Sequence, residues 1–342
     1  MRFWCRFRVI SPERTSRVGS RNLTDFLQLR RSLQESLADT VIRDRYAVGM
    51  SSTAPIGRPV SSDTHDRDSE VVSARLGVVS FLNTRPIISG LEDQPGMTLV
   101  PMVPSRLIDE VVKGEVDAAL CSSIDYLRSP VPLQALRVAP LTCNGPTLTV
   151  RLFSRVPLEN IDVVHCDTDS HTSVALLRIL MQDLWKRNPD FIDHEASAAP
   201  ADGVAEWPDT VMLIGDKVVT HAPTESTHPH QFDLGEAWKE LTGFPFVFAL
   251  WLARADTPDH VLSRVSEALA DQLACNIAEI DALVQREAPE HGWPVNLART
   301  YLNGLIRYEL GPEQLAGVQA FHERARKHGL VEYDRSLVFF GD

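Results

Sequence analysis

Short apolar runs alternate with amphipathic stretches along most of this chain, from residue 75 to about residue 330. In the first run, residues 76–82 (LGVVSFL), the apolar side chains leave no polar face, which predicts a buried strand. The run ends at Asn83-Thr84-Arg85-Pro86, where the proline favours the start of a helix. An amide, a hydroxyl and a guanidinium are thereby placed at the carboxyl end of a strand, where open α/β sheets bind ligands. Taken alone, the segment fits a polar turn without a function equally well.

The later segments repeat this alternation of strand and helix and predict an α/β fold. Further strands are expected at residues 97–103, 116–120, 136–141, 147–153, 161–165, 211–216 and 246–252. Helices are expected from after Pro104-Ser105 to Gly114 and at residues 174–185, 236–241, 257–283, 297–308 and 312–327, with shorter ones after residues 86 and 123.

Two strands predicted to cross between α/β units divide the chain into two lobes. The outgoing strand is expected near residues 149–153 and the return strand near residues 246–254, and the helices that follow come back to the first unit. The first lobe is predicted to comprise residues 74–150 and 255–342, and the second lobe residues 151–254 with its hinge strands. Two lobes joined by two crossings are typical of a protein that binds its ligand in a central cleft.

Residues 1–73 differ in composition from the rest of the chain. They begin with an arginine- and serine-rich stretch that lacks the apolar core of a secretory signal. A short helix is possible at residues 23–45, and residues 51–70 form a low-complexity linker of Ser, Thr, Pro and Asp. We expect most of this N-terminal extension to be disordered. A targeting peptide and an added start, with translation beginning at Met50, both remain open.

Composition and charge narrow the class of partner. The chain has 342 residues, enough for two domains, and its 44% hydrophobic and 23% charged residues are ordinary for a soluble globular protein. A formal charge of −12 argues against nucleic acid or an anionic membrane as the main partner. No apolar stretch approaches the roughly 20 residues of a membrane helix. The five cysteines are odd in number and include no C-x-x-C pair, which favours a reduced, cytoplasmic setting without disulfides or a zinc site.

Hydroxyl groups gather where the helix predicted at residues 174–185 begins. The preceding segment, residues 166–173, reads CDTDSHTS and contains four hydroxyl residues and two aspartates. One Ser or Thr is enough to cap a helix. The excess favours a site in which free backbone N–H groups and hydroxyls hold a carboxylate or a phosphate.

Two other segments each have two interpretations. His228 and His230 lie in a His- and Pro-rich loop at residues 221–231, where a solvated loop is favoured over a metal site because no supporting ligand set is present. Residues 232–251 are the densest aromatic segment of the chain. They are most simply core, although part of the segment can equally form the apolar wall of a pocket for a planar ring.

Six motifs carry a resemblance to a known family. They are SFLNTRP at 80–86, GEVDAAL at 114–120, NGPTLT at 144–149, SHTSVALL at 170–177, LIGD at 213–216 and DLGEAWKELTGFPFVFALW at 233–251. With this set in this order, the chain resembles the chorismate dehydratases of the futalosine route to menaquinone, from residue 75 to about 330. GEVDAAL is weak by itself, whereas the first and last motifs are specific.

The resemblance implies a two-lobed α/β fold like that of type II periplasmic binding proteins, with a central cleft and a helical C-terminal segment. It also implies the removal of water from chorismate to give 3-(1-carboxyvinyloxy)benzoate in menaquinone biosynthesis, without a cofactor or a metal. The expected partner is therefore a small-molecule substrate, chorismate. The sequence does not indicate an oligomeric state.

The resemblance also assigns roles to individual residues. Asn83 is implied as the central amide of the site, and Thr149, which closes NGPTLT, as the hydroxyl that works beside it in catalysis. Substrate-binding roles are expected for Ser80, Arg85, Ser122, Ser123, Gly145, Ser170, His171, Thr172, Ser173 and Asp216.

Three positions depart from the pattern of the family. Asn144 replaces an aspartate, Thr149 a serine and His171 an arginine. Thr149 keeps a hydroxyl, so its role survives with one extra methyl group to fit. His171 changes more, because a fixed cation becomes one that titrates near neutrality.

Aromatisation of the ring drives the loss of its hydroxyl and the neighbouring hydrogen, so the site mainly has to orient the substrate. We expect Asn83 and Thr149 to hydrogen-bond the departing hydroxyl while a carboxylate of chorismate takes the proton, with His171 as the rival base. Two other functions remain open: dihydroxynaphthoate synthase, the sister enzyme of the same fold and pathway, and a non-catalytic solute-binding protein.

Overall fold

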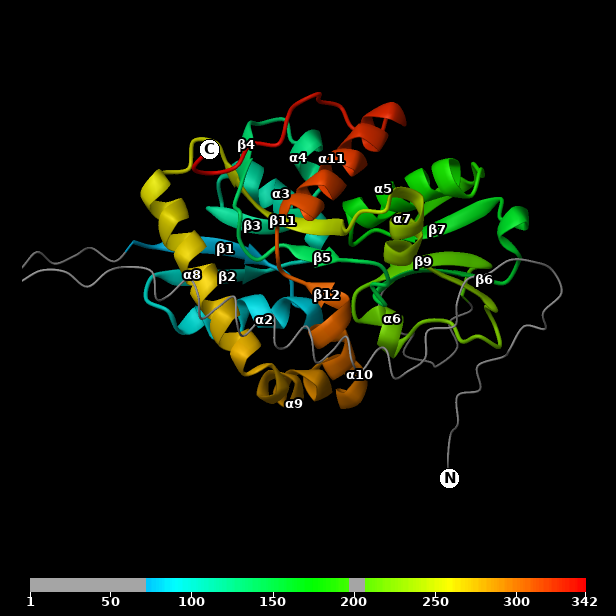
Figure 1. Ribbon diagram of the computed structural model, residues 1–342, viewed down its shortest axis with the longest axis horizontal. Helices are drawn as coiled ribbons and strands as arrows, with labels where there is room; N and C mark the ends of the chain where they lie inside the picture. Colours follow the sequence, from blue (N-terminus) through cyan, green and yellow to red (C-terminus); the bar gives the residue numbers. More distant parts are fainter. Residues whose placement is uncertain (1–71, 197–206) are drawn as a thin grey trace, which may run out of the picture. The chain divides into compact units, whose positions relative to one another are not determined.

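The computed structural model describes residues 72–196 and 207–342 (Figure 1). The predicted N-terminal extension lies outside the described residues, apart from its last two positions. The strands are β1 Ala74–Val78, β2 Met97–Pro101, β3 Ala118–Ser122, β4 Leu133–Ala135, β5 Leu141–Cys143, β6 Val150–Ser154, β7 Val163–Asp167, β8 Asp190–His194, β9 Thr210–Ile214, β10 His230–Asp233, β11 Phe246–Arg254 and β12 Ile306–Arg307. The helices are α2 Arg85–Ile88, α3 Pro104–Lys113, α4 Asp125–Arg128, α5 His171–Ile179, α6 Lys217–Thr220, α7 Leu234–Thr242, α8 Asp259–Ala278, α9 Ile280–Glu290, α10 Val295–Thr300 and α11 Pro312–Lys327.

The larger of two sheets has seven strands. Its order is β12-β5-β11-β3-β1-β2, and β4 pairs with β11 off this path. β1 runs parallel to β2 and β3, whereas β11 runs antiparallel to β3, β4 and β5. Leu76 of β1 is fully buried between Leu99 and Ala118, as the predicted absence of a polar face requires. The carboxyl ends of β1 and β3 therefore open on the same edge of the sheet.

The smaller sheet has five strands in the order β10-β6-β9-β7-β8. β7 runs parallel to β8 and β9, and β6 runs antiparallel to β9 and β10. β9 is buried at all five positions, which explains the apolar run VMLI that follows Thr210. The two sheets give the two-lobed, mixed α/β architecture that the resemblance implied.

Helices cover both faces of the larger sheet. One core contains side chains of α2, α8 and α9 packed on β1, and the other contains side chains of α3 and α11 packed on β3 and β11. In the smaller sheet, α5 and α7 share a core with β6, β7 and β9. Figure 1 shows α8, α9 and α10 following one another along one side of the larger sheet and α11 returning on the other.

The observed elements differ from the predicted ones in several places. The expected strand at residues 136–141 is two short strands, β4 and β5, which pair in succession with the long strand β11. The chain bulges between them because Ala139 has a left-handed φ of 44° and Pro140 has no N–H to donate. The expected helix at residues 257–283 breaks after Ala278, and the one at residues 297–308 gives way to a π-helical turn and β12. β8 and β10 were not predicted, since neither has a clear apolar period.

The crossings between the sheets are short loops rather than whole strands. β6 lies in the smaller sheet, whereas β11, which was predicted as a hinge strand of the second lobe, pairs with β3, β4 and β5 in the larger one. The chain therefore passes from one sheet to the other within residues 144–149 and returns within residues 243–245. Seven of the nine residues of β11 are buried, which explains the hydrophobic run that predicted a strand here.

Candidate functional site

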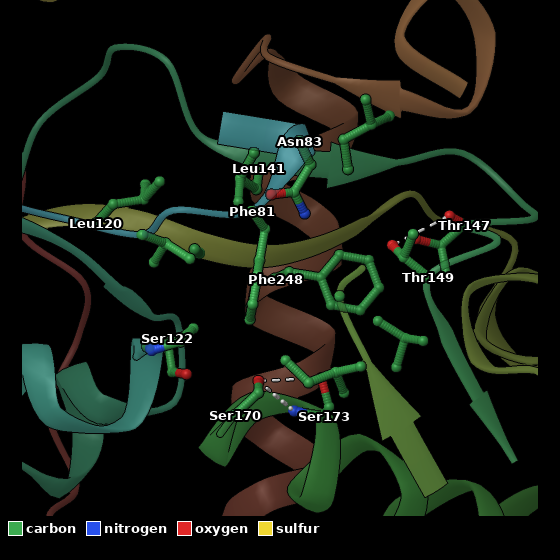
Figure 2. A pocket seen from close by; sticks show the side chains of 17 residues that line it. Phe81, Asn83, Leu120, Ser122, Leu141, Thr147, Thr149, Ser170, Ser173 and Phe248 are labelled. Atoms are coloured by element: carbon green, nitrogen blue, oxygen red, sulfur yellow. Dashed lines mark hydrogen bonds between the residues drawn. The ribbon is translucent and has the colours of Figure 1, made fainter. Parts of the chain in front are cut away.

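A cavity lies where the carboxyl ends of β1, β3, β7 and β9 meet. Including the solvent space at its mouth, it spans about 530 Å³. Side chains from both sheets point into it (Figure 2). The lining residues are Val79, Phe81, Asn83, Pro104, Leu120, Ser122, Leu141, Thr147, Thr149, Val150, Ser170, Ser173, Ile214, Gly215, Phe248, Ala249 and Ile306. All seventeen have uncharged side chains.

Asn83 reaches this cavity from a 3₁₀ turn directly after β1 (Figure 2). The Thr84 hydroxyl fixes the turn by donating to the carbonyls of Val79 and Phe81, at 2.6 and 2.8 Å. The hydroxyl of Tyr308 donates to the backbone carbonyl of Asn83 at 2.9 Å. The side-chain Oδ1 of Asn83 is buried and has no hydrogen-bond partner among the described residues. The amide is therefore held in place by its backbone and has an unused acceptor at the cavity.

Thr149 and Thr147 line the cavity from the crossing before β6. Asp233 supports this loop, because its carboxylate accepts from the backbone N–H groups of Thr147 and Leu148, at 3.0 and 2.7 Å for the closest oxygens. Leu148 can thereby keep a left-handed φ of 65°. The Thr149 hydroxyl lies 2.8 Å from the hydroxyl of Tyr301. The buried hydroxyl of Thr147 has no hydrogen-bond partner in the described part of the chain.

Three serines form the opposite wall of the cavity. Ser170 caps α5 by accepting from the backbone N–H of Ser173 at 3.3 Å and from its hydroxyl at 3.0 Å. Ser122 ends β3 and is 2% exposed. The predicted hydroxyl cluster at the start of α5 thus supplies two lining residues, and β3 adds a third (Figure 2).

His171 turns away from the cavity. Its Nδ1 lies 2.8 Å from Oδ1 of Asp125, which belongs to α4 beside the larger sheet, and the ring lines an outer groove instead. Burial raises the pKa of Asp125, and the hydrogen bond with His171 acts in the opposite direction. The neighbouring Thr172 accepts from the backbone N–H of Ile124 at 3.2 Å. Both contacts join the start of α5 to the start of α4.

Arg85 and Ser80 also lie apart from the cavity. The Arg85 guanidinium donates to the carboxylate of Glu287, with Nε 2.6 Å from Oε2. Burial acts to raise the pKa of Glu287, but hydrogen bonds from Arg85 and Arg286 outweigh it and hold the pKa below its usual value. Ser80 is exposed to solvent. The guanidinium expected at the substrate therefore anchors the Asn83 turn to α9.

The remaining predicted residues surround the cavity without lining it. The Ser123 hydroxyl donates to the carbonyl of Val247 at 2.8 Å, and Gly145 turns the crossing loop with a φ of 107°. Asp216 follows β9 and accepts from the backbone N–H of Leu82 at 3.2 Å, from Nδ1 of His291 at 2.8 Å and from Nε1 of Trp293 at 2.9 Å. Asp216 thus ties the Asn83 turn to the smaller sheet and to the C-terminal helices.

Several lining residues were not singled out from the sequence. Thr147 and Gly215 lie inside quoted motifs, next to residues that were named, so their motif positions were the available signal. Phe248 comes from the aromatic segment and confirms the interpretation that part of it forms a pocket wall, whereas Trp238 and Phe246 pack in the core. Tyr301 gave no local signal, because its contact with Thr149 spans 152 positions.

The predictions about metals, cysteines and membranes concern the same described region. Within residues 72–196 and 207–342, no three His, Cys, Asp or Glu side chains are grouped as metal ligands. His228 is fully buried and donates from Nε2 to the carbonyl of Pro208, so a solvated loop is wrong for this residue.

The described cysteines, Cys121, Cys143, Cys166 and Cys275, are free thiols. The helices in these two ranges are all too short or too polar to cross a membrane.

Two sheets with four strand ends around one cavity give this chain the fold of the periplasmic binding proteins. AF1704 of Archaeoglobus fulgidus has this architecture, with a TM-score of 0.64 at 14% identity, over 76% of this chain and 98% of that one. CA3427 of Candida albicans, described as having the generic periplasmic binding protein fold, gives a TM-score of 0.57 at 9% identity, over 77% and 92%. SsuA of Xanthomonas axonopodis, an alkanesulfonate-binding protein, gives 0.55 at 14% identity, over 78% and 96%.

The sequence places the chain more narrowly within this class. It belongs to the menaquinone biosynthesis family, whose model matches residues 74–327. The chorismate dehydratase of Thermus thermophilus is 28% identical over 262 residues, which cover 72% of this chain and 93% of that protein.

Proposed function

We propose that this chain is a chorismate dehydratase that acts in menaquinone biosynthesis. The family match and the relative from Thermus thermophilus support this activity. The main structural support for this activity is that the Asn83 amide and the Thr149 hydroxyl line one cavity. Oδ1 of Asn83 has no hydrogen-bond partner among the described residues. A buried acceptor left without a partner within the described residues is costly unless a ligand uses it.

The proposed reaction converts the cyclohexadiene ring of chorismate into a benzene ring. The C–H bond breaks at the ring carbon that bears the enolpyruvyl ether, and its electron pair becomes a ring π bond. The C–O bond of the neighbouring hydroxyl breaks at the same time or afterwards, so a proton and a hydroxide leave as one water. Asn83 and Thr149 orient the ring and hydrogen-bond the departing hydroxyl. Orientation and hydrogen bonding are enough, because aromatisation supplies the driving force.

The neutral lining of the cavity supports a substrate carboxylate as the base. Its seventeen lining residues are uncharged, so a bound carboxylate would be held by hydroxyl, amide and backbone N–H groups and not by a cation. A carboxylate without a cation at its side keeps more of its basicity than one paired with arginine. The rival base, His171, contacts Asp125 and lines the outer groove, which favours the substrate carboxylate in this proposal.

The binding residues divide into two groups in this proposal. Ser122, Ser170 and Ser173 touch the substrate from the cavity wall. Arg85, Thr172 and Asp216 act on the cavity through the turns and helix ends that they hold. We further propose a cytoplasmic setting, because the cysteine usage of the chain fits a reduced compartment. The family match favours neither dihydroxynaphthoate synthase nor a non-catalytic solute-binding protein.

The direct test is incubation of the purified full chain with chorismate. We expect an aromatic product that is lighter than chorismate by one water and still carries the enolpyruvyl ether, followed by ultraviolet absorbance and mass spectrometry. Asn83→Ala is expected to lower kcat by about a hundredfold or more, because a hydrogen-bonding group at the reacting oxygen is lost. Asn160→Ala is the matched control, since Asn160 is exposed and precedes β7 at the end away from the cavity.

Two results would refute the proposal. A wild-type chain that binds chorismate without forming this product would support a solute-binding protein instead. An Asn83→Ala variant that keeps half of the wild-type kcat would remove Asn83 from the reaction.

A further inference from the structure

We infer that Tyr301 is a positioning residue for the proposed reaction, acting from behind the cavity by orienting the hydroxyl of Thr149. This inference rests on the proposed function. Tyr301 does not itself line the cavity, whereas Thr149 does. The tyrosine belongs to the π-helical turn Tyr301–Leu305 between α10 and β12, far from Thr149 in the sequence.

The contact between the two hydroxyls is short and shielded from water. The oxygens of Tyr301 and Thr149 lie 2.8 Å apart, and the two residues are 0% and 2% exposed. The other polar contact of the Thr149 hydroxyl, with the carbonyl of Thr147, is 3.5 Å long and lies at the limit of a hydrogen bond. Tyr301 is therefore the partner that decides how the Thr149 hydroxyl is oriented.

The chemistry of the two groups sets the direction of the hydrogen bond. A phenol is a better donor than an aliphatic hydroxyl, because it is the stronger acid. When Tyr301 donates to Thr149, the hydrogen of Thr149 is free to point into the cavity and donate to a substrate oxygen. A departing hydroxyl needs a donor, so this direction is the productive one.

Tyr301 is suited to this role as a neutral donor. Burial raises its pKa, and hydrogen bonds with Thr149 and Asn83 oppose that effect without cancelling it. The phenol consequently stays protonated over the working range of pH.

The ring of Tyr301 is held rigidly. It stacks on Trp293, with ring centroids 5.0 Å apart and an interplanar angle of 25°. The indole of Trp293 donates to Asp216, the same carboxylate that accepts from the backbone N–H of Leu82 beside Asn83. The hydroxyl of Tyr301 and the turn of Asn83 therefore share one support, as a positioning residue requires.

The test compares two tyrosine-to-phenylalanine substitutions. Tyr301→Phe keeps the stacked ring and removes only the hydroxyl. Tyr126→Phe is the matched control, because Tyr126 is 2% exposed and its hydroxyl donates to the Ser336 carbonyl at 2.9 Å, remote from the cavity lining. We expect similar losses of melting temperature in both variants. We expect kcat to fall about tenfold only in Tyr301→Phe, with KM unchanged, since the Thr149 hydroxyl remains but is no longer oriented.

A double-mutant cycle with Thr149→Val shows whether Tyr301 acts through Thr149. In the Thr149→Val background, Tyr301→Phe is expected to cause no further loss of kcat. An equal loss in both backgrounds would overturn the inference, as would a Tyr301→Phe variant with wild-type kcat. A changed pH profile in Tyr301→Phe would also overturn it, because it would make Tyr301 a proton-transfer group. A wild-type chain that forms no aromatic product would instead refute the proposed function, and the role with it.

Discussion

At the scale of single residues, two of the buried polar atoms that have no partner among the described residues lie at the cavity. Oδ1 of Asn83 and Oγ1 of Thr147 are buried, line the cavity and have no hydrogen-bond partner among the described residues. Each such atom costs about 1–3 kcal/mol of folding stability when nothing bonds to it. Asn83→Ala is therefore expected to leave the melting temperature unchanged or slightly raised while turnover falls. Loss of activity together with a lowered melting temperature would instead give Asn83 a structural role.

The hydroxyl of Thr149 is expected to matter more than its methyl group. Thr149→Ser keeps the hydroxyl and should lower kcat less than about threefold, whereas Thr149→Val removes it and should cost about a hundredfold or more. Serine is smaller than threonine, whereas valine has nearly the same shape. A change in side-chain volume alone would therefore lower the kcat of the serine variant at least as much as that of the valine variant. Steady-state kinetics with chorismate measures the difference. Comparable kcat values for the serine and valine variants would show that the hydroxyl is not required.

His171 contacts Asp125 and does not face the cavity. The resemblance implied a cation at the start of α5, and the structure places an imidazole there that contacts Asp125 at 2.8 Å. Asp125 is 1% exposed, so the hydrogen bond with His171 replaces part of the contact with water that its carboxylate has lost. His171 therefore joins α5 to α4, and the serines of α5 remain as the groups that face the cavity.

At the scale of elements, α11 carries a histidine that makes stability depend on pH. His322 is 3% exposed, and its Nε2 donates to the carbonyl of Ser123, directly after β3. Burial lowers the pKa of His322 from 6.5 to about 4. The unfolded chain binds the proton more tightly, so the stability from this group is complete above pH 6.5 and is lost as the pH falls towards 4.

Between pH 7.5 and pH 5, this linkage is expected to remove about 2 kcal/mol from the free energy of unfolding. His322→Gln keeps a neutral donor of similar reach and should abolish that part of the pH dependence. Denaturant unfolding of both proteins at the two pH values gives the difference. His260→Gln is the control, because His260 is exposed on α8. An unchanged pH dependence in His322→Gln would show that other groups are responsible.

Strands and helices with one dominant apolar pattern were predictable from the sequence. α11 was predicted with its observed bounds, and β9 and β11 were recognised because burial on both faces gives an uninterrupted apolar run. β8 and β10 were missed, since edge strands are only partly buried and carry polar residues. The break at residues 136–140 has one local signal, Pro140, whereas the separate pairing of β4 and β5 with β11 is decided by tertiary packing.

The same limit applies to the site. Asn83 and Ser122 were predictable because each lies at or after a strand end, where ligand sites of this fold form. Ser170 and Ser173 were predictable from the cluster of hydroxyl residues at the start of α5. Arg85 was misleading, because its partner, Glu287, lies 202 positions away and no local pattern shows the pair. Buried ion pairs between distant segments are decided by tertiary packing, and the same holds for the contact between Thr149 and Tyr301.

At the scale of the whole molecule, the cavity is closed by contacts between elements of the two sheets. Leu82 N–H donates to Asp216, and Ser105 N–H donates to the carbonyl of Asp169 at 3.0 Å. The ring of Phe81 lies against Gly215, where an added Cβ would come within 2.9 Å of it. Gly215 also has a left-handed φ of 68°, so two constraints favour glycine at this contact. Because these contacts join the two sheets beside the cavity, the cleft between them is closed.

We expect chorismate to favour this closed arrangement, with the loops at residues 144–149 and 243–245 as hinges. Spin labels on Cys275 of α8 and on an Ile192→Cys substitution in β8, in a Cys5→Ser chain, report the distance between the two sheets. Cys275 and Ile192 are exposed, whereas the other described cysteines are buried. Saturating chorismate should shorten and narrow the distance distribution. The pair Cys275 and Val338→Cys lies on one lobe and should not change, whereas equal distributions for the first pair would exclude closure.

The ion pair between Arg85 and Glu287 also affects the order in which parts of the chain fold during synthesis. The turn that presents Asn83 emerges from the ribosome early, but it is anchored by Glu287, 202 positions after Arg85, and by Tyr308, 225 positions after Asn83. Most strands of both sheets are complete before those anchors exist. The turn of Asn83 is consequently among the last parts to acquire its final conformation, and a nascent chain that ends before residue 287 lacks both of its anchors.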